Sequence, residues 1–222
     1  MNATDAGGQP TAFKSLTAAV ANALQQDLVA GRYMPGEKLP IARLISEGLV
    51  EFNEQRGFRA APVSRAALLD VTRTRIMIDA HALREAIRLG DVDWEAEILA
   101  IQHRLANCVT REPHDPTKVR EEWQRLHRVF HRTLIAACGS SWLMRFHDQL
   151  FDQTIRYRSV AAAYETQRQD LRKDVAGEHA RIVEAVIARD ADAAAAAIEK
   201  HYMTTASVII EAPELVAGSA QS

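Results

Sequence analysis

Apolar residues recur at three- and four-residue steps along most of the chain after residue 64, a pattern that predicts amphipathic helices. The clearest stripe runs through Val119, Trp123, Leu126, Phe130 and Leu134. Just before it, Asp115 and Pro116 are a typical helix start, an acidic cap followed by proline at the first helical position. Comparable stripes predict six helices, near residues 65–89, 92–110, 116–138, 140–163, 166–188 and 191–211. Their short connections favour antiparallel neighbours in a bundle.

The first quarter of the chain has a different pattern. Two short apolar segments, 49–52 and 58–61, flank a polar loop that ends in Gly57, which is typical of a β-hairpin. We therefore predict a mainly α protein with two parts. A small N-terminal domain occupies residues 12–62, and an all-α antiparallel bundle occupies residues 65–212.

Composition limits the classes of partner. The 222 residues carry 27 Lys and Arg against 29 Asp and Glu, so any contact with DNA has to come from a local patch. No apolar run approaches the roughly 20 residues that a membrane span needs. Cys108 and Cys138 form no CxxC pair and are interpreted as buried, reduced thiols. These features predict a soluble, cytoplasmic protein that does not bind membranes.

Four of the eight histidines fall at positions that suggest a metal site. His127 and His131 are four residues apart, so they project from neighbouring turns of one helix. His179 and His201 each occupy a stripe position where an apolar residue is expected. A buried imidazole needs hydrogen-bond partners or a metal. We predict that these four side chains bind one divalent ion, with Zn or Ni favoured and Mn or Fe remaining open.

Two arginines are candidates for binding an anionic ligand. Arg75 and Asp79 are four residues apart on one predicted helix, which leaves two interpretations. They form an ion pair at the edge of the core, or Arg75 reaches a cavity and binds a carboxylate. Arg158, on the helix opposite, is the second candidate contact. The remaining histidines have no such spacing and are expected on the surface: His81, His103, His114 and His147.

Several segments resemble one family of proteins. Residues 28–39 (Leu-Val-Ala-Gly-Arg-Tyr-Met-Pro-Gly-Glu-Lys-Leu) resemble the opening of the winged helix-turn-helix of GntR-family transcriptional regulators, and 47–58 resemble its end and wing. Residues 71–79 are similar to the first effector-domain helix of the FadR subfamily. The pairs Phe-His at 130–131 and Glu-His at 178–179 look like metal-site motifs of that domain. The likeness covers nearly the whole chain and is closest to CsiR-like regulators, which respond to small dicarboxylates.

The resemblance implies a homodimer that binds operator DNA and carries a helical effector domain of the FCD type. Such a domain binds a divalent metal and a small carboxylate, a dicarboxylate being one candidate. Its metal motif falls on the same four histidines, although most relatives carry an acidic residue at the position of His127. An all-imidazole site stays cationic around a divalent ion and so favours an anionic ligand. DNA contacts are carried over to Arg32, Arg43, Arg56 and Gly57.

One departure from the family pattern affects DNA recognition. Between Leu39 and Gly48 the family has a helix, a turn and the recognition helix, and by comparison about 18 residues are absent here. Either the segment was lost from this sequence or the chain is a natural variant without specific operator binding. The functional hypotheses are therefore a metabolite-responsive regulator and, alternatively, an effector-binding module. A metalloenzyme is disfavoured because no HExxH-like general base accompanies the histidines.

Overall fold

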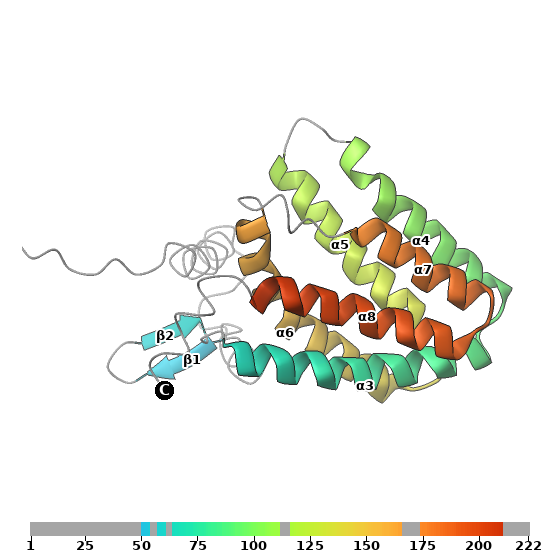
Figure 1. Cartoon of the computed structure of the whole chain (residues 1–222), viewed down its shortest axis with the longest axis horizontal. Coiled ribbons are helices and arrows are strands. Elements are labelled where there is room, and N and C mark those ends of the chain that lie inside the picture. The colour runs from blue at the N-terminus through green and yellow to red at the C-terminus, as the bar shows by residue number, and fades with distance from the viewer. Residues whose placement is uncertain (1–49, 54–56, 61–63, 112–115, 166–173, 211–222) are drawn as a thin grey trace, which may run out of the picture.

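The computed structural model describes residues 50–53, 57–60, 64–111, 116–165 and 174–210 (Figure 1). Two short strands precede the helices: β1 (Val50–Asn53) and β2 (Gly57–Ala60). They pair antiparallel, with Val50 opposite Ala60 and Asn53 opposite Gly57. The hairpin predicted from the two apolar segments is therefore confirmed.

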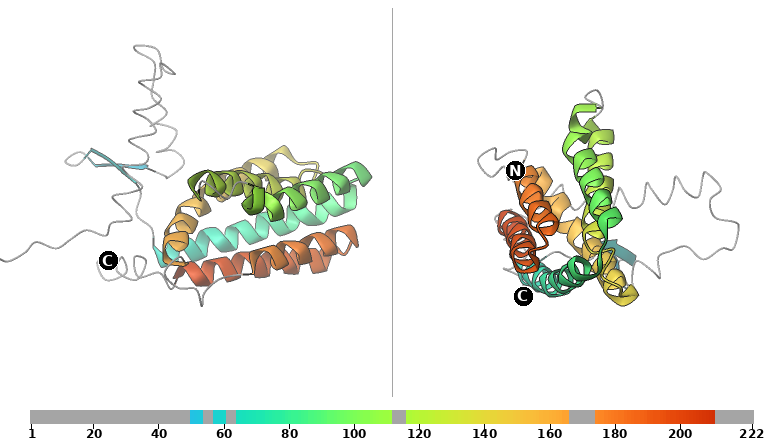
Figure 2. Two further views of the ribbon diagram at one scale, coloured as in Figure 1. Left: turned by 90° about the horizontal axis from the view of Figure 1, so that it is seen from above. Right: turned by 90° about the vertical axis from the view of Figure 1, so that its right-hand side faces the viewer.

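The rest of the described chain forms a helical bundle. Its helices are α3 (Arg65–Leu89), α4 (Val92–Arg111), α5 (Pro116–Leu134), α6 (Ser141–Glu165), α7 (Val175–Ile187) and α8 (Ala191–Ile210). Helix α3 lies beside α8 and α6, α4 packs on α5, and α7 contacts both α8 and α4. The right-hand view of Figure 2 shows α3 and α8 nearly end-on, whereas α4 and α5 form a pair inclined to them. The mainly α fold with an antiparallel bundle is confirmed.

Polar side chains cap the N-terminal turns of three helices. The Ser64 Oγ accepts a hydrogen bond from the N–H of Ala67 at 3.1 Å and starts α3, as its position before the helix suggests. Asp91 caps α4 in the same way. The Asp190 Oδ1 accepts from the N–H of Ala193 at 2.9 Å and starts α8. Each cap satisfies a helical N–H that would otherwise lack a partner.

Two helix ends differ from the sequence prediction. Helix α5 ends at Leu134, because the following residues form a tight turn that leads to Gly139 in the left-handed region, at φ 71°. Helix α7 begins at Val175, where Asp174 caps it through the N–H of Gly177. Residues 166–173 of the predicted helix lie outside the described residues.

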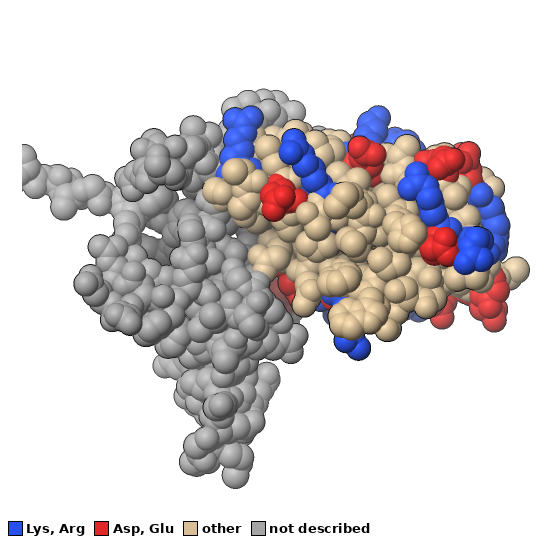
Figure 3. All heavy atoms as spheres, turned by 90° about the horizontal axis from the view of Figure 1, so that it is seen from below, with Lys and Arg blue, Asp and Glu red and all other residues tan. Residues whose placement is uncertain are grey.

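The core combines apolar residues from most of the helices. Its fully buried members include Leu83, Ile98, Phe130, Leu134, Ile182 and Ile198. Cys108 and Cys138 are both buried, as predicted. Figure 3 shows basic and acidic side chains interspersed on the face it presents. Among the described helices, none combines the length and apolar character needed to cross a membrane.

Candidate metal centre

The structure brings together the four histidines that the sequence singled out. His127 and His131 project from α5, His179 from α7 and His201 from α8, and all four are buried. One ligand atom from each lies within 4.8 Å of all the others. The Nε2 atoms of His127 and His131 lie 3.1 Å apart. We refer to these four side chains as the histidine cluster.

The dimensions of the histidine cluster are close to those of a site for a single ion. A zinc–nitrogen bond is about 2.1 Å long, so the nitrogens of a tetrahedral zinc site are about 3.4 Å apart. The 4.8 Å limit on the separations is about 1.4 Å wider than that. The imidazoles would therefore have to move inward to bind an ion.

Helix α7 supplies a carboxylate that orients one of these imidazoles. The Glu178 Oε2 lies 2.7 Å from the Nδ1 of His201. A carboxylate only accepts, so His201 carries its proton on Nδ1, and Nε2 is its unprotonated nitrogen. Glu178 is itself buried. Carboxylate–histidine pairs of this kind fix the ring orientation and raise the basicity of metal ligands.

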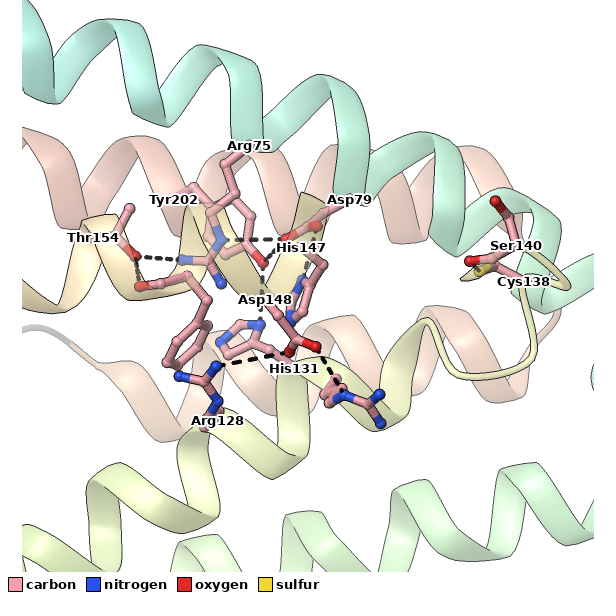
Figure 4. A network of polar contacts seen from close by, with 12 residues as sticks. Arg75, Asp79, Arg128, His131, Cys138, Ser140, His147, Asp148, Thr154 and Tyr202 are labelled. Carbon is pink, nitrogen blue, oxygen red and sulfur yellow. Dashed lines mark hydrogen bonds and ion pairs between the residues drawn. The ribbon is translucent and has the colours of Figure 1, made fainter. Parts of the chain in front are cut away.

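A tyrosine orients a second imidazole. The Tyr202 hydroxyl donates to the Asp79 Oδ2 at 2.7 Å. Its oxygen lies 3.3 Å from the Nδ1 of His131 and therefore accepts from that N–H. The Nε2 of His131 is then the unprotonated nitrogen, and it faces His127. Figure 4 shows this chain of contacts running from α3 through Tyr202 to His131.

Burial keeps the site in the protonation state that metal binding requires. Burial lowers the pKa of His131 well below its ordinary value of 6.5, and the neighbouring His127 and His201 lower it further. His131 is therefore a neutral ligand near neutral pH. Burial also raises the pKa of the Tyr202 hydroxyl well above 10.0, so this group stays protonated and donates to Asp79.

Aromatic rings enclose the histidine cluster. The ring of Trp123 stacks on His127 with centroids 4.6 Å apart and an interplanar angle of 23°. Phe130 lies 4.6 Å from His179 on another side. Phe151, from α6, lies 6.0 Å from His127. These walls exclude water and so strengthen electrostatic interactions inside the site.

Arg75 is buried and forms polar contacts inside the bundle. Its Nε donates to the Asp79 Oδ2 at 3.2 Å, and its Nη1 donates to the Thr154 Oγ1 at 3.2 Å. Its guanidinium carbon lies 4.0 Å from the centre of the Tyr202 ring. The Nη2 is buried without a hydrogen-bond partner among the described residues. The ion pair with Asp79 is thus present in the interior, and the two N–H groups of Nη2 remain as donors.

His147 is buried, so its predicted place on the surface is wrong. It lies on α6 with none of its surface exposed, and its Nδ1 is 2.9 Å from the Asp79 Oδ1. Leu143 and Phe151 lie one turn before and after it, so His147 occupies a stripe position of α6. The physical reason for burial is the Asp79 carboxylate, which gives the imidazole a charged partner inside the core.

Asp79 is the centre of this second group, which we call the Asp79 network: Arg75, Asp79, His147 and Tyr202. Burial alone would raise the pKa of Asp79, but the hydrogen bond and charge of His147, the charge of Arg75 and the Tyr202 hydroxyl lower it below its ordinary value. Asp79 is therefore an ionised carboxylate that accepts three hydrogen bonds.

The remaining candidate residues divide into two groups. Gly57 opens β2, and His81 and His103 are exposed, as expected. Arg158 belongs to α6, but its side chain lies outside the described residues. Also outside them are Arg32, Arg43, Arg56 and His114.

Comparison with known proteins gives a consistent result. The family model described as "FCD domain" matches residues 70–204. The "Uncharacterized HTH-type transcriptional regulator BphR" of Paraburkholderia xenovorans (strain LB400) is 31% identical over 92% of this chain and 90% of its own length. The "HTH-type transcriptional repressor GlaR" of Escherichia coli (strain K12) is 29% identical over 85% of this chain and 93% of its own.

Solved structures share the fold. The E. coli protein McbR/YncC matches 89% of this chain and 98% of its own, with a TM-score of 0.63 and 19% identity. A putative transcriptional regulator GntR from Rhodococcus sp. RHA1 matches 89% of this chain and 99% of its own, with a TM-score of 0.60 and 16% identity. At these identities the likeness concerns the fold alone.

Proposed function

Because the chain belongs to the GntR family of transcriptional regulators and carries an FCD domain, we propose that it is a metabolite-responsive regulator. In this proposal the bundle over residues 65–212 is the effector domain, and residues 12–62 are the DNA-binding part. The histidine cluster binds a divalent metal, and a small carboxylate binds beside it. The protein acts as a homodimer, and it is a regulator rather than an enzyme.

A single observation carries the metal assignment. Four buried imidazoles from three helices have ligand atoms within 4.8 Å of one another. Two of them, His131 and His201, are held by Tyr202 and Glu178 with Nε2 as the unprotonated nitrogen. A set of four nitrogen ligands favours Zn or Ni, with Mn and Fe as further candidates. The metal would supply a positive centre to which an acid can bind.

Charge supports the carboxylate effector. Four neutral imidazoles leave the full charge of a divalent ion uncompensated, so an anion is favoured next to it. Arg75 adds a buried guanidinium whose Nη2, with two N–H groups, has no partner among the described residues. We propose that this Nη2 donates to the acid. Binding of the acid would shift the helices that carry these groups.

Metal analysis tests the assignment. We expect the purified full-length chain to contain about one equivalent of a divalent transition metal per monomer. Inductively coupled plasma mass spectrometry measures this content. His179→Ala should lose most of it, since one of four ligands is removed. His81→Ala, at an exposed position, is the matched control and should retain the metal. Unchanged metal content in His179→Ala would refute the site.

Operator binding needs a separate experiment. The alignment with BphR runs over 224 positions although only 92% of this 222-residue chain takes part, so it includes positions that this chain lacks. This agrees with the short segment between Leu39 and Gly48. A gel-shift assay on DNA beside the chromosomal gene should detect sequence-specific binding if the protein is a complete regulator. Metal binding without any specific shift would instead identify an effector-binding module.

A further inference from the structure

Helices α3 and α6 share an outer face on which large apolar side chains are exposed. A groove of about 420 Å³ runs between the two helices, and its lining includes Ile78 from α3 and Phe146 and Leu150 from α6. Met77 and Trp142 are 67% and 63% exposed, and Phe146 is 42% exposed. We refer to this surface, the groove with Met77 and Trp142, as the α3–α6 groove.

Helical spacing makes these side chains one continuous surface. Met77 directly precedes Ile78 on α3, and on α6 Trp142, Phe146 and Leu150 follow one another at four-residue steps. The rings of Trp142 and Phe146 have centroids 6.0 Å apart. Figure 3 views the molecule from the side of α3 and shows a broad area without Lys, Arg, Asp or Glu, with charged side chains gathered at one end.

The α3–α6 groove has the composition of a protein–protein interface. Aromatic residues, Met and Arg are enriched in interfaces, and Lys is depleted. The groove combines Met77, Trp142 and Phe146 with Arg145, whose guanidinium carbon lies 4.8 Å from the centre of the Trp142 ring. Neither α3 nor α6 contains a lysine. Because a monomer rarely exposes a large contiguous apolar patch, we expect a partner to cover this one.

The charges around the groove favour a second copy of this chain as that partner. Asp70 and Arg73 are exposed near the groove on α3 and have opposite signs, and Asp152 is paired with Arg128. A two-fold interface brings one surface against an identical one, so a large net charge would repel the partner. The small net charge of this surface permits self-association, and it offers no strong field to a highly charged partner.

The size of the surface also agrees with a dimer. Helices α3 and α6 each contain 25 residues. With three to four of every seven residues on one face, the two helices together offer about 20 to 25 residues. A standard protein–protein interface uses about 20–30 residues from each partner.

We propose that the α3–α6 groove is the dimer interface, with a second copy of this chain as its occupant. The inference rests on the proposed function, in which the chain acts as a homodimer. A two-fold axis through the groove places α3 of each copy against α6 of the other, because the two helices lie on either side of it. Met77, Phe146 and Trp142 then leave water. Arg75 and Asp79 are buried on the inner side of the same α3, so the interface and the Asp79 network share one helix.

A charged substitution in the groove tests this proposal. Met77→Glu introduces a carboxylate that the interface would bury once in each copy, whereas the position is exposed in a single chain and tolerates a charge there. Analytical ultracentrifugation should show a dimer for the unmodified full chain. We expect Met77→Glu to raise the dissociation constant of the dimer by at least about 100-fold. Leu99→Glu, where the leucine of α4 is 49% exposed, is the matched control and should remain a dimer.

Methionine oxidation gives a second measurement on the unmodified chain. A brief exposure to hydroxyl radicals converts accessible methionines to the sulfoxide, and mass spectrometry of peptides measures the extent. In a single chain Met77 is 67% exposed and Met203, on α8, is 39% exposed, so Met77 should react faster. In the dimer the order should reverse, because the partner covers Met77 and leaves Met203 accessible. Dilution below the dissociation constant should restore the order of the single chain.

The outcomes distinguish this proposal from the one on which it rests. A dimer that Met77→Glu leaves intact, or in which Met77 still reacts faster than Met203, overturns the interface alone. A full chain that is monomeric at about 100 μM contradicts both the interface and the homodimer. Protection of Met77 in a monomeric chain also overturns the interface, because another part of the same chain then covers the groove. Circular dichroism establishes that both variants are folded, and the oxidation of the unmodified chain decides the question without them.

Discussion

The imidazoles of the histidine cluster are oriented by residues that never touch the metal position. Glu178 fixes His201, and Tyr202 links His131 to the buried carboxylate of Asp79. Such outer partners determine which nitrogen faces the ion, and their loss usually weakens metal binding 10- to 100-fold. We therefore expect the metal affinity of the proposed site to depend on polar residues from α3, α7 and α8.

Glu178→Ala tests this dependence. The substitution leaves all four imidazoles in place but removes the acceptor of the His201 Nδ1–H. We expect zinc affinity to fall by about 10- to 100-fold, measured by competition with a chelator of known affinity. Glu184→Ala, at an exposed position of the same helix, is the matched control. Equal affinities for the two variants would show that Glu178 does not support the site.

A second residue-scale prediction concerns the pH dependence of the metal-free protein. The pKa of His131 is lowered by burial, so the unfolded chain takes up a proton at higher pH than the folded chain does. The contribution of His131 to stability is complete above about pH 6.5 and is lost as the pH falls toward its folded-state pKa. One such group changes the free energy of unfolding by at most about 1.4 kcal/mol per pH unit.

Urea unfolding between pH 5 and pH 8, with metal removed, measures this slope. The unmodified chain should lose stability steadily on acidification below pH 6.5. His131→Gln should have a shallower slope, whereas the exposed-site control His81→Gln should follow the unmodified chain. If the free energy of unfolding had the same pH dependence in all three proteins, the pKa of His131 would be the same in the folded and the unfolded chain.

Among the helices, the connection from α5 to α6 has the strictest backbone requirement. Gly139 adopts φ 71°, and a Cβ at this position would lie 3.2 Å from the Leu89 Cδ1. Gly139→Ala should therefore lower the free energy of unfolding by about 1–2 kcal/mol, as thermal or urea unfolding can measure. Gly139→Asn should cost less, because asparagine enters the left-handed region more readily. An equal loss for both variants would point to crowding against Leu89 instead of backbone strain.

Periodicity and caps account for most of what the sequence predicted about the elements. The strand segments at 49–52 and 58–61 and the start of α3 after Ser64 were recognisable because each rests on local chemistry. Helix α7 was predicted too long at its start, since the break at Asp174 lacks a glycine or proline. The Asp174 side chain can be identified as the cap of α7 only from its hydrogen bond with the N–H of Gly177.

In the candidate site, too, a local sequence pattern identifies some residues, whereas others are identified only by how the helices pack. His179 and His201 were found because each interrupts an apolar stripe, and His147 was missed although it interrupts the stripe of α6 in the same way. The partners Glu178 and Tyr202 are different, because nothing local to them specifies which imidazole they contact. Such pairings depend on how the helices pack and need coordinates.

At the scale of the whole molecule, a metal ion would connect helices that are otherwise held by packing. The histidine cluster draws on α5, α7 and α8, so an ion bound there stabilises the folded state and not the unfolded chain. At 100 times the dissociation constant the gain is about 2.7 kcal/mol. We expect added zinc or nickel to raise the thermal midpoint by several degrees and a chelator to reverse the change.

The control for this effect is His179→Ala, whose midpoint should not respond to either metal. His103→Ala, at an exposed histidine, should respond like the unmodified chain. If the metal also raised the thermal midpoint of His179→Ala, the stabilising ion would bind elsewhere in the molecule.

The length of α3 has a mechanical consequence. Arg75 and Asp79 belong to an unbroken helix that starts at Arg65, directly after the Ser64 cap. At a rise of 1.5 Å per residue, Arg75 lies about 15 Å from that start. A helix of this kind behaves as a stiff lever, so a small tilt imposed near Arg75 would displace its far end. A few residues upstream of that end lies the hairpin, so a tilt of α3 caused by ligand binding at the proposed site would reach the segment that joins the hairpin to the bundle.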